Sequence, residues 1–140
     1  MASNTWRRFM RAYGAFAAAA VLVTAGYIAA SMFLMRLHWQ RTLEADRAAC
    51  YRDPTDAGRI TMVVGDLSVL GEHRAAAAFA AAHLSGGPGD DAIRLAMADE
   101  EWAEGDRAAA HAQRVVVARS KSYWFAAEAR YDLAHPDSGR

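Results

Sequence analysis

The sequence predicts an all-α protein in which one N-terminal transmembrane helix is followed by a small domain of about five helices. Residues 12–35 form a run of 24 residues without charge or proline, bounded by Arg11 and Arg36. As a helix, such a run is long enough to cross ~30 Å of hydrocarbon, where lipid offers no partner to an unpaired amide. The rest of the chain carries apolar residues at helical spacing, and none of it alternates long enough to predict a strand.

The chain divides into four predicted parts. Residues 1–11 are a basic tail, residues 12–37 are the transmembrane helix, residues 38–53 are a juxtamembrane stalk, and residues 54–140 are the helical domain. Because the stalk contains no helix breaker, we expect it to continue the membrane helix.

The N-terminal segment also resembles an export signal, so two other interpretations stay open. A cleaved signal peptide would end at the small residues 29–31, but the apolar run continues beyond that site through Met35. A twin-arginine signal would use Arg7 and Arg8, although the spacing around this pair is compressed. We favour an uncleaved anchor.

Positive charge is nearly balanced across the predicted span, so the positive-inside rule separates the two orientations weakly. The cations are Arg7, Arg8 and Arg11 before the span, and Arg36, Arg41, Arg47 and Arg52 after it. Because the first three are clustered without an acid, we expect a cytoplasmic N-terminus and an extracytoplasmic C-terminal domain, in a bacterial inner membrane.

Small residues four positions apart in the span predict a face for close helix packing. The pairs are Gly14 with Ala18, Ala25 with Ala29, and Gly26 with Ala30. Such pairs also arise by chance in an alanine-rich helix. The scarcity of leucine nevertheless fits a helix packed against protein, so the expected partners are other integral membrane proteins together with the lipid bilayer.

Five helices are predicted after the stalk, over residues 54–70, 72–84, 90–104, 107–119 and 122–134. Asp53 and Asp106 are the predicted N-caps of the first and fourth of these helices. The first helix is predicted to bury Ile60, Val63, Val64, Leu67 and Leu70. The fourth is predicted to bury Ala108, Ala112, Val115 and Val116. The aromatic residues near the end of the chain are expected to serve mostly as core and as a cap on the domain: Trp102, Tyr123, Trp124, Phe125 and Tyr131.

Two segments of the domain repeat one another. Residues 70–76 and 104–110 align with Gly71 and Gly105 in register, each between two predicted helices. In this period of about 34 residues, and in layout, residues 57–134 resemble two degenerate tetratricopeptide (TPR) repeats followed by a terminal helix. The resemblance implies stacked helical hairpins that bind other proteins. Ser122 stands where the family often has proline, and the first-helix landmarks match only in kind, so a generic helical-hairpin bundle is the alternative.

No catalytic, cofactor or metal site is predicted. Cys50 is the only cysteine, and no two of the five histidines lie three or four residues apart, so zinc, iron–sulfur and haem sites lack support. No phosphate-binding loop or nucleophile elbow occurs. From residue 38 onward, 12 Lys or Arg stand against 16 Asp or Glu, a net charge of −4, which argues against nucleic acid. The acids of residues 99–106 either form a patch for a basic partner or complement the basic helix that follows.

We therefore expect a membrane-anchored protein–protein interaction module without enzymatic activity, and without a small-molecule substrate. The leading expectation is an accessory or assembly subunit of a larger bacterial membrane complex. The alternative is a free-standing TPR adaptor that binds peptides in secretion, pilus or envelope biogenesis. The adaptor would need a polar, exposed inner face on residues 54–70 and 91–103, and it would behave as a monomer.

Overall fold

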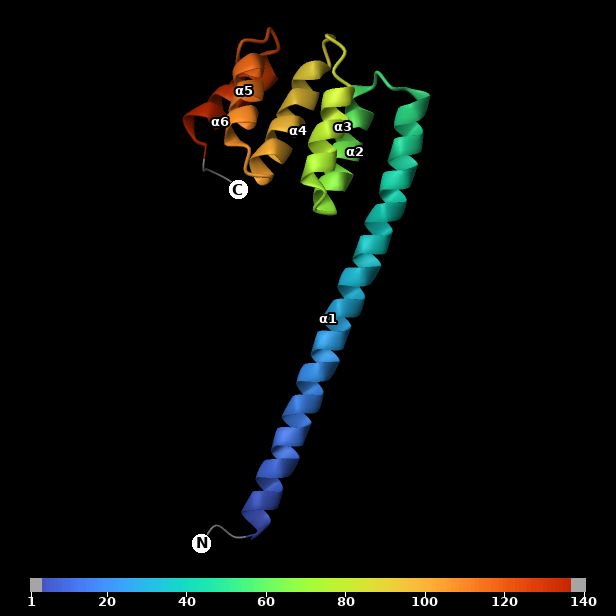
Figure 1. Ribbon diagram of the computed structural model, residues 1–140, viewed down its shortest axis with the longest axis vertical. Coiled ribbons are helices and arrows are strands. Elements are labelled where there is room, and N and C mark those ends of the chain that lie inside the picture. The colour runs from blue at the N-terminus through green and yellow to red at the C-terminus, as the bar shows by residue number, and fades with distance from the viewer. Residues whose placement is uncertain (1–3, 137–140) are drawn as a thin grey trace. The chain divides into compact units, whose positions relative to one another are not determined.

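The computed structural model describes residues 4–136, and within this range it contains six α-helices and no strand (Figure 1). The helices are α1 (Asn4–Arg52), α2 (Ala57–Val69), α3 (His73–Ala82), α4 (Asp90–Ala103), α5 (Arg107–Ala118) and α6 (Tyr123–Ala134). The predicted all-α class is confirmed. The chain forms two compact units, Met1–His38 and Trp39–Arg140, and α1 runs through the boundary between them.

The first unit contains the apolar run of α1, which is almost wholly exposed over residues 13–35. Among the described helices, α1 alone is long and apolar enough to cross a membrane, and none of its apolar window is buried. Its one threonine in the apolar run needs no outside partner, because the Thr24 hydroxyl donates to the Ala20 carbonyl oxygen at 2.9 Å. A helix whose backbone is hydrogen-bonded internally and that exposes apolar side chains all round is suited to an apolar solvent.

The second unit is built of helices that pack against their neighbours in chain order. Contacts join α2 to α3, α3 to α4, α4 to α5 and α5 to α6, and they also join α2 to α4 and α4 to α6. One apolar cluster links α2, α3 and α4 with Leu43 and Cys50 of α1. A smaller cluster of Leu95, Val117 and Ala129 links α4, α5 and α6. The core is therefore thickest around α2 and thins toward α6.

The first predicted helix of the domain starts later than expected. Asp56, and not Asp53, is the N-cap of α2, because its Oδ1 accepts from the backbone N–H of Gly58 at 2.9 Å and of Arg59 at 3.2 Å. The Asp53 Oδ1 instead accepts from the Thr55 hydroxyl at 3.1 Å. The predicted stripe is confirmed for Ile60, Val63, Val64 and Leu67, which are buried, while Leu70 is half-buried.

The turns that close the two hairpins are alike. Gly71 and Gly105 have positive φ angles of 77° and 90°. The amide after each glycine donates to the carbonyl oxygen five residues back, from Glu72 to Leu67 at 2.9 Å and from Asp106 to Glu101 at 2.8 Å. Such a closure with glycine in the left-handed region is a Schellman motif. Because α3 begins at His73 and α5 at Arg107, the repeat period of the sequence is also a period of the backbone.

Asp106 caps α5 as predicted, since its Oδ1 accepts from the Ala109 N–H at 3.0 Å. The predicted inner face of α5 is wrong. Ala108, Ala112 and Val116 are exposed and Val115 is half-buried, whereas the buried residues are Ala110, Arg114 and Val117. The buried face of α5 is rotated from the predicted face because Arg114, and not Val115 or Val116, lies on the inner side of the helix.

The prediction that the aromatic residues serve mostly as core and as a cap is wrong as to the core for most of those on the last helix. Ala126 and Ala129 are the buried residues of α6, and Phe125 is half-buried. Tyr123, Trp124 and Tyr131 are exposed. Two small side chains let α6 approach its neighbours closely, so the bulky rings are left on the outside.

Candidate interaction surfaces

The six predicted packing residues of α1 are all exposed, but they do not form one face. They are Gly14, Ala18, Ala25, Gly26, Ala29 and Ala30. At 3.6 residues per turn, the first three and Ala29 share an arc of about 60°, whereas Gly26 and Ala30 lie on a separate face. A Cβ atom added at Gly14 or Gly26 would meet no atom within 4 Å. The apolar helix thus offers two small-residue faces to neighbours.

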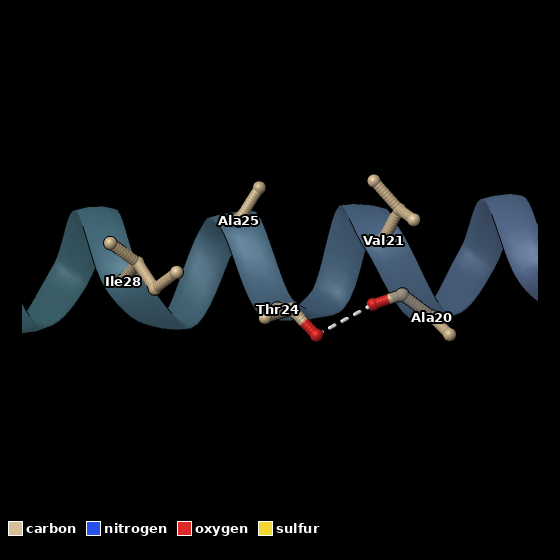
Figure 2. Close-up of a pocket in the computed structure, with 5 residues that line it drawn as sticks. All are labelled: Ala20, Val21, Thr24, Ala25 and Ile28. Atoms are coloured by element: carbon tan, nitrogen blue, oxygen red, sulfur yellow. Dashed lines mark hydrogen bonds between the residues drawn. The ribbon is translucent and has the colours of Figure 1, made fainter.

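Beside the larger of these faces lies a shallow apolar groove that the small-pair pattern missed. It is lined by Ala20, Val21, Thr24, Ala25 and Ile28, and Ala25 is the one predicted packing residue among them. Figure 2 shows Val21 and Ala25 projecting together, while Thr24 turns toward the Ala20 carbonyl. The groove combines branched and small side chains at positions i, i+4 and i+7, a spacing typical of helix–helix seams.

Several exposed aromatic side chains of the second unit gather on α6. Tyr123 is 75% exposed, Trp124 79% and Tyr131 58%. The rings of Tyr123 and Trp124 meet edge-on with centroids 5.6 Å apart, and Tyr131 stacks on His135 at 4.5 Å. Large rings gathered on one helix are the kind of apolar patch that marks an interaction site on a soluble surface. We call Tyr123, Trp124, Ala127, Tyr131 and Ala134, all exposed, the outer face of α6.

The edge of α6 that meets α5 is basic. The Arg130 guanidinium donates to the Ala118 carbonyl oxygen from Nε at 3.1 Å and from Nη2 at 2.9 Å. Arg119 and Lys121, in the connection between the two helices, are exposed. This basic edge contrasts with the second unit as a whole, in which acids outnumber Lys and Arg.

A buried arginine joins the three C-terminal helices. Arg114, only 2% exposed, donates from Nη2 to Asp99 Oδ1 on α4 at 3.1 Å, and its Nε lies 3.5 Å from Asp132 Oδ2 on α6. Its guanidinium also lies 5.3 Å from the centre of the Trp102 ring. The expected complementarity between the acidic cluster and the basic helix is confirmed for the Asp99–Arg114 pair.

The other acids of the cluster have separate surroundings. Glu100 is buried and its Oε2 lies 2.7 Å from Nδ1 of His73 on α3. Glu104 lies 3.6 Å from Arg74, whose side chain is almost wholly exposed. Burial, and then the charge of Asp106, raises the pKa of Glu101. Asp99 therefore pairs with α5, whereas Glu100 and Glu104 both pair with α3. The acids are divided between these two helix contacts, which argues against one patch that includes the whole cluster.

The remaining chemistry-bearing residues do not converge on a site. Among the described residues, no group of three His, Cys, Asp or Glu side chains is placed to hold a metal ion. Cys50 is buried in the core, and burial is the main cause that raises the pKa of its thiol. A thiol in this position is shielded from pairing with another chain. Comparison of the chain with protein-family models, with curated proteins and with solved structures gave no match.

Proposed function

We propose that this protein is a membrane-anchored interaction module, an accessory or assembly subunit of a larger bacterial membrane complex. α1 anchors the chain with its N-terminus in the cytoplasm, and the second unit lies on the extracytoplasmic side. The observation that carries the proposal is the joining, in one chain, of a fully exposed apolar helix to a small domain with an exposed aromatic face. Both surfaces are suited to packing against other proteins.

The second unit acts as a TPR-like module. Its support is the pair of Schellman turns one repeat period apart, with a buried alanine five residues after each glycine, at Ala76 and Ala110. The packing of α4 on both helices of the preceding hairpin, and of α6 on both α4 and α5, also fits stacked hairpins. Repeats of this kind bind proteins through surfaces that side chains of several helices share.

We favour the subunit over the free-standing peptide adaptor. The adaptor requires a polar, exposed inner face on the first helix of each hairpin. On α2, the exposed side chains include Met62 and Val69, each more than half exposed, whereas Asp66 is buried. An apolar exposed surface is better suited to a permanent contact with a subunit than to a peptide that must also be released.

The test is to extract the protein from its native membrane in mild detergent through a C-terminal tag, and to measure the native mass and identify the accompanying chains. The proposal expects a stoichiometric set of integral membrane proteins. The intact mass of the purified chain also distinguishes an uncleaved anchor from a cleaved signal peptide, because cleavage at residues 29–31 would remove most of the apolar segment. A lone monomer, or a cleaved chain found in the soluble fraction, would contradict the proposal.

Two matched variants locate the packing face of α1. Ala25→Leu fills the larger small-residue face and the adjoining groove, whereas Ala30→Leu fills the other face with the same added side chain. Since a leucine prevents close backbone approach, we expect one of them to lower recovery of the complex about tenfold and the other to leave it unchanged. Unchanged recovery with both would mean that the complex assembles without these faces.

A further inference from the structure

We infer that the outer face of α6 binds a helix of a partner protein, one that carries an apolar stripe and acidic residues beside it. The inference rests on the proposed function, because it names the kind of partner that the second unit would engage. Two independent features of α6 support it, namely the spacing of its exposed apolar residues and the charge along its edge.

The spacing of the outer face predicts a helical partner. Trp124, Ala127, Tyr131 and Ala134 lie at positions i, i+3, i+7 and i+10 of α6, and all four are exposed. This is the spacing at which one helix presents a continuous apolar seam to another. Large rings alternate with alanines along the seam, so that the gaps over Ala127 and Ala134 can accept side chains of an opposing helix.

α6 is apolar on its opposite side as well. Ala126 and Ala129 are buried against α4 and α5, with Phe125 and Leu133 half-buried beside them. A helix with apolar residues on two opposite sides is typical of an interior position between neighbours. In the second unit, α3 and α5 pack on α2 and α4 respectively, and α6 is the last helix of the series (Figure 1). The residues of its outer face are exposed, so no described helix covers them. The partner helix would take this vacant neighbouring position.

Charge favours an acidic partner over a second copy of this chain. Arg119 and Lys121 are exposed where α6 begins, and Arg130 lies at the α5 edge. A second α6 would offer these cations only Glu128 and Asp132, and Asp132 already lies 3.5 Å from the buried Arg114. An acidic helix would instead gain from several cations at once, which raises both its specificity and its rate of association.

The experiment uses the full chain in lipid nanodiscs and two labelled synthetic helices of about 20 residues. Both peptides carry leucine at the seam positions, and they differ only in having glutamate or lysine at every other exposed position. Binding is followed by fluorescence anisotropy. We expect the acidic peptide to bind at least about tenfold more tightly than the basic peptide, and Lys121→Glu to reduce that preference.

Variants of the seam show where the peptide binds. Trp124→Ala and Tyr131→Ala should each weaken the acidic peptide about tenfold, because exposed aromatic anchors carry most of the affinity of such interfaces. Tyr51→Ala is the matched control, since Tyr51 is an 83% exposed ring on α1 and lies outside the seam. All three rings are exposed, so their removal should leave the circular dichroism spectrum unchanged.

Several outcomes would overturn the inference. Equal binding of the two peptides, or binding that Trp124→Ala and Tyr51→Ala affect alike, would remove the outer face as the site. If the native mass is that of a dimer, and Trp124→Ala converts it to a monomer, the outer face binds a second copy of this chain instead. If brominated lipid quenches the fluorescence of Trp124, the outer face lies against the bilayer instead. If the complex from the native membrane is also recovered with the double variant Trp124→Ala, Tyr131→Ala, this inference fails and the proposed function stands. If the unchanged protein gives no complex, the proposed function fails.

Discussion

In the first hairpin, α2–α3, Ala80 occupies the position that Arg114 occupies one repeat later in the second hairpin, α4–α5. Both residues are buried, although one side chain is a methyl group and the other ends in a guanidinium. Asp66 and Glu100 are likewise equivalent positions of the repeat and both buried, yet Asp66 faces another acid, Asp46, and Glu100 faces His73. One backbone repeat therefore holds two chemically different interiors.

The different interiors of the two hairpins show that the repeat is preserved in the turns and not in the core. The Schellman closures at Gly71 and Gly105 are nearly identical, whereas the side chains between the helices have diverged. The first hairpin is held by apolar contacts in the larger cluster, and the second depends on a buried cation with carboxylates on both neighbouring helices. A change in the interior of one hairpin should therefore alter the stability of that hairpin and hardly alter the stability of the other. A change at the glycine turn, which is alike in the two hairpins, should have the same effect in both.

The largest effect is expected from Arg114→Ala. Removing the guanidinium leaves Asp132 partly buried without this cation and opens a cavity between three helices, which should cost about 3 kcal/mol of local stability. Native-state hydrogen exchange of the full chain should show faster exchange in α5 and α6 but not in α2 and α3. Arg74→Ala is the control, because its pair with Glu104 is exposed and contributes little. If the two variants changed hydrogen exchange equally, the burial of Arg114 would not be the reason for its contribution to stability.

A pH effect of up to about 3 kcal/mol is expected in the first hairpin. Burial, followed by the hydrogen bond and charge of Asp46, raises the pKa of Asp66 to about 6, from a usual value near 4. Since the folded chain holds this proton more tightly than the unfolded chain, the associated stability is fully present below pH ~4 and is lost as pH rises through 6.

Thermal unfolding at a series of pH values measures this contribution. The Asp66→Asn chain, which cannot ionise at this position, should lose this component of the pH dependence between pH 4 and 6. Asp46→Asn should reduce it, because a neutral neighbour no longer opposes ionisation of Asp66. An unchanged pH profile in the Asp66→Asn chain would contradict the raised pKa of Asp66. An unchanged profile in the Asp46→Asn chain alone would show that the two carboxyl groups do not interact.

The smallest effect is expected where the hairpins are alike. Gly71→Ala and Gly105→Ala each place a Cβ atom in the left-handed region, which should cost about 1 kcal/mol in both hairpins. Neither Cβ would meet another atom within 4 Å, so strain is the only source of the cost. Gly65→Ala, in the exposed interior of α2, should instead stabilise the chain by about 1 kcal/mol. Thermal unfolding compares the three, and unequal costs at the two turns would refute their equivalence.

Much of the helical pattern followed from the sequence because it depends on local chemistry. Helix period, glycine turns and the Asp106 cap act within a few residues, so all five helices after the stalk were predictable, with ends displaced by a few residues. The misplaced start of α2 has the same local origin, because both Asp53 and Asp56 are suitable caps and the chain uses the second. The buried stripe of α2 was predictable because its apolar residues are branched and regularly spaced.

The interior of the second hairpin and the candidate surfaces were not predictable in this way. Arg114 is assigned to the outside by its charge, and only the placement of Asp99 and Asp132 on two other helices makes its burial electrostatically tolerable. The rings of α6 are assigned to the inside by their size, but alanines occupy the contacts with α4 and α5. The groove on α1 mixes valine and isoleucine with alanine, a combination that a search for small pairs alone overlooks.

The burial of Cys50 gives the protein a natural reporter of its own opening. It is the only cysteine of the chain, it is 2% exposed, and it lies where the end of α1 meets the core of the second unit. A thiol-specific reagent can reach it only when that part of the core opens, so the labelling rate of the native chain reports how often the end of α1 separates from α2. Because the closed state does not react, a single cysteine placed elsewhere can be labelled alone, without first replacing the natural one.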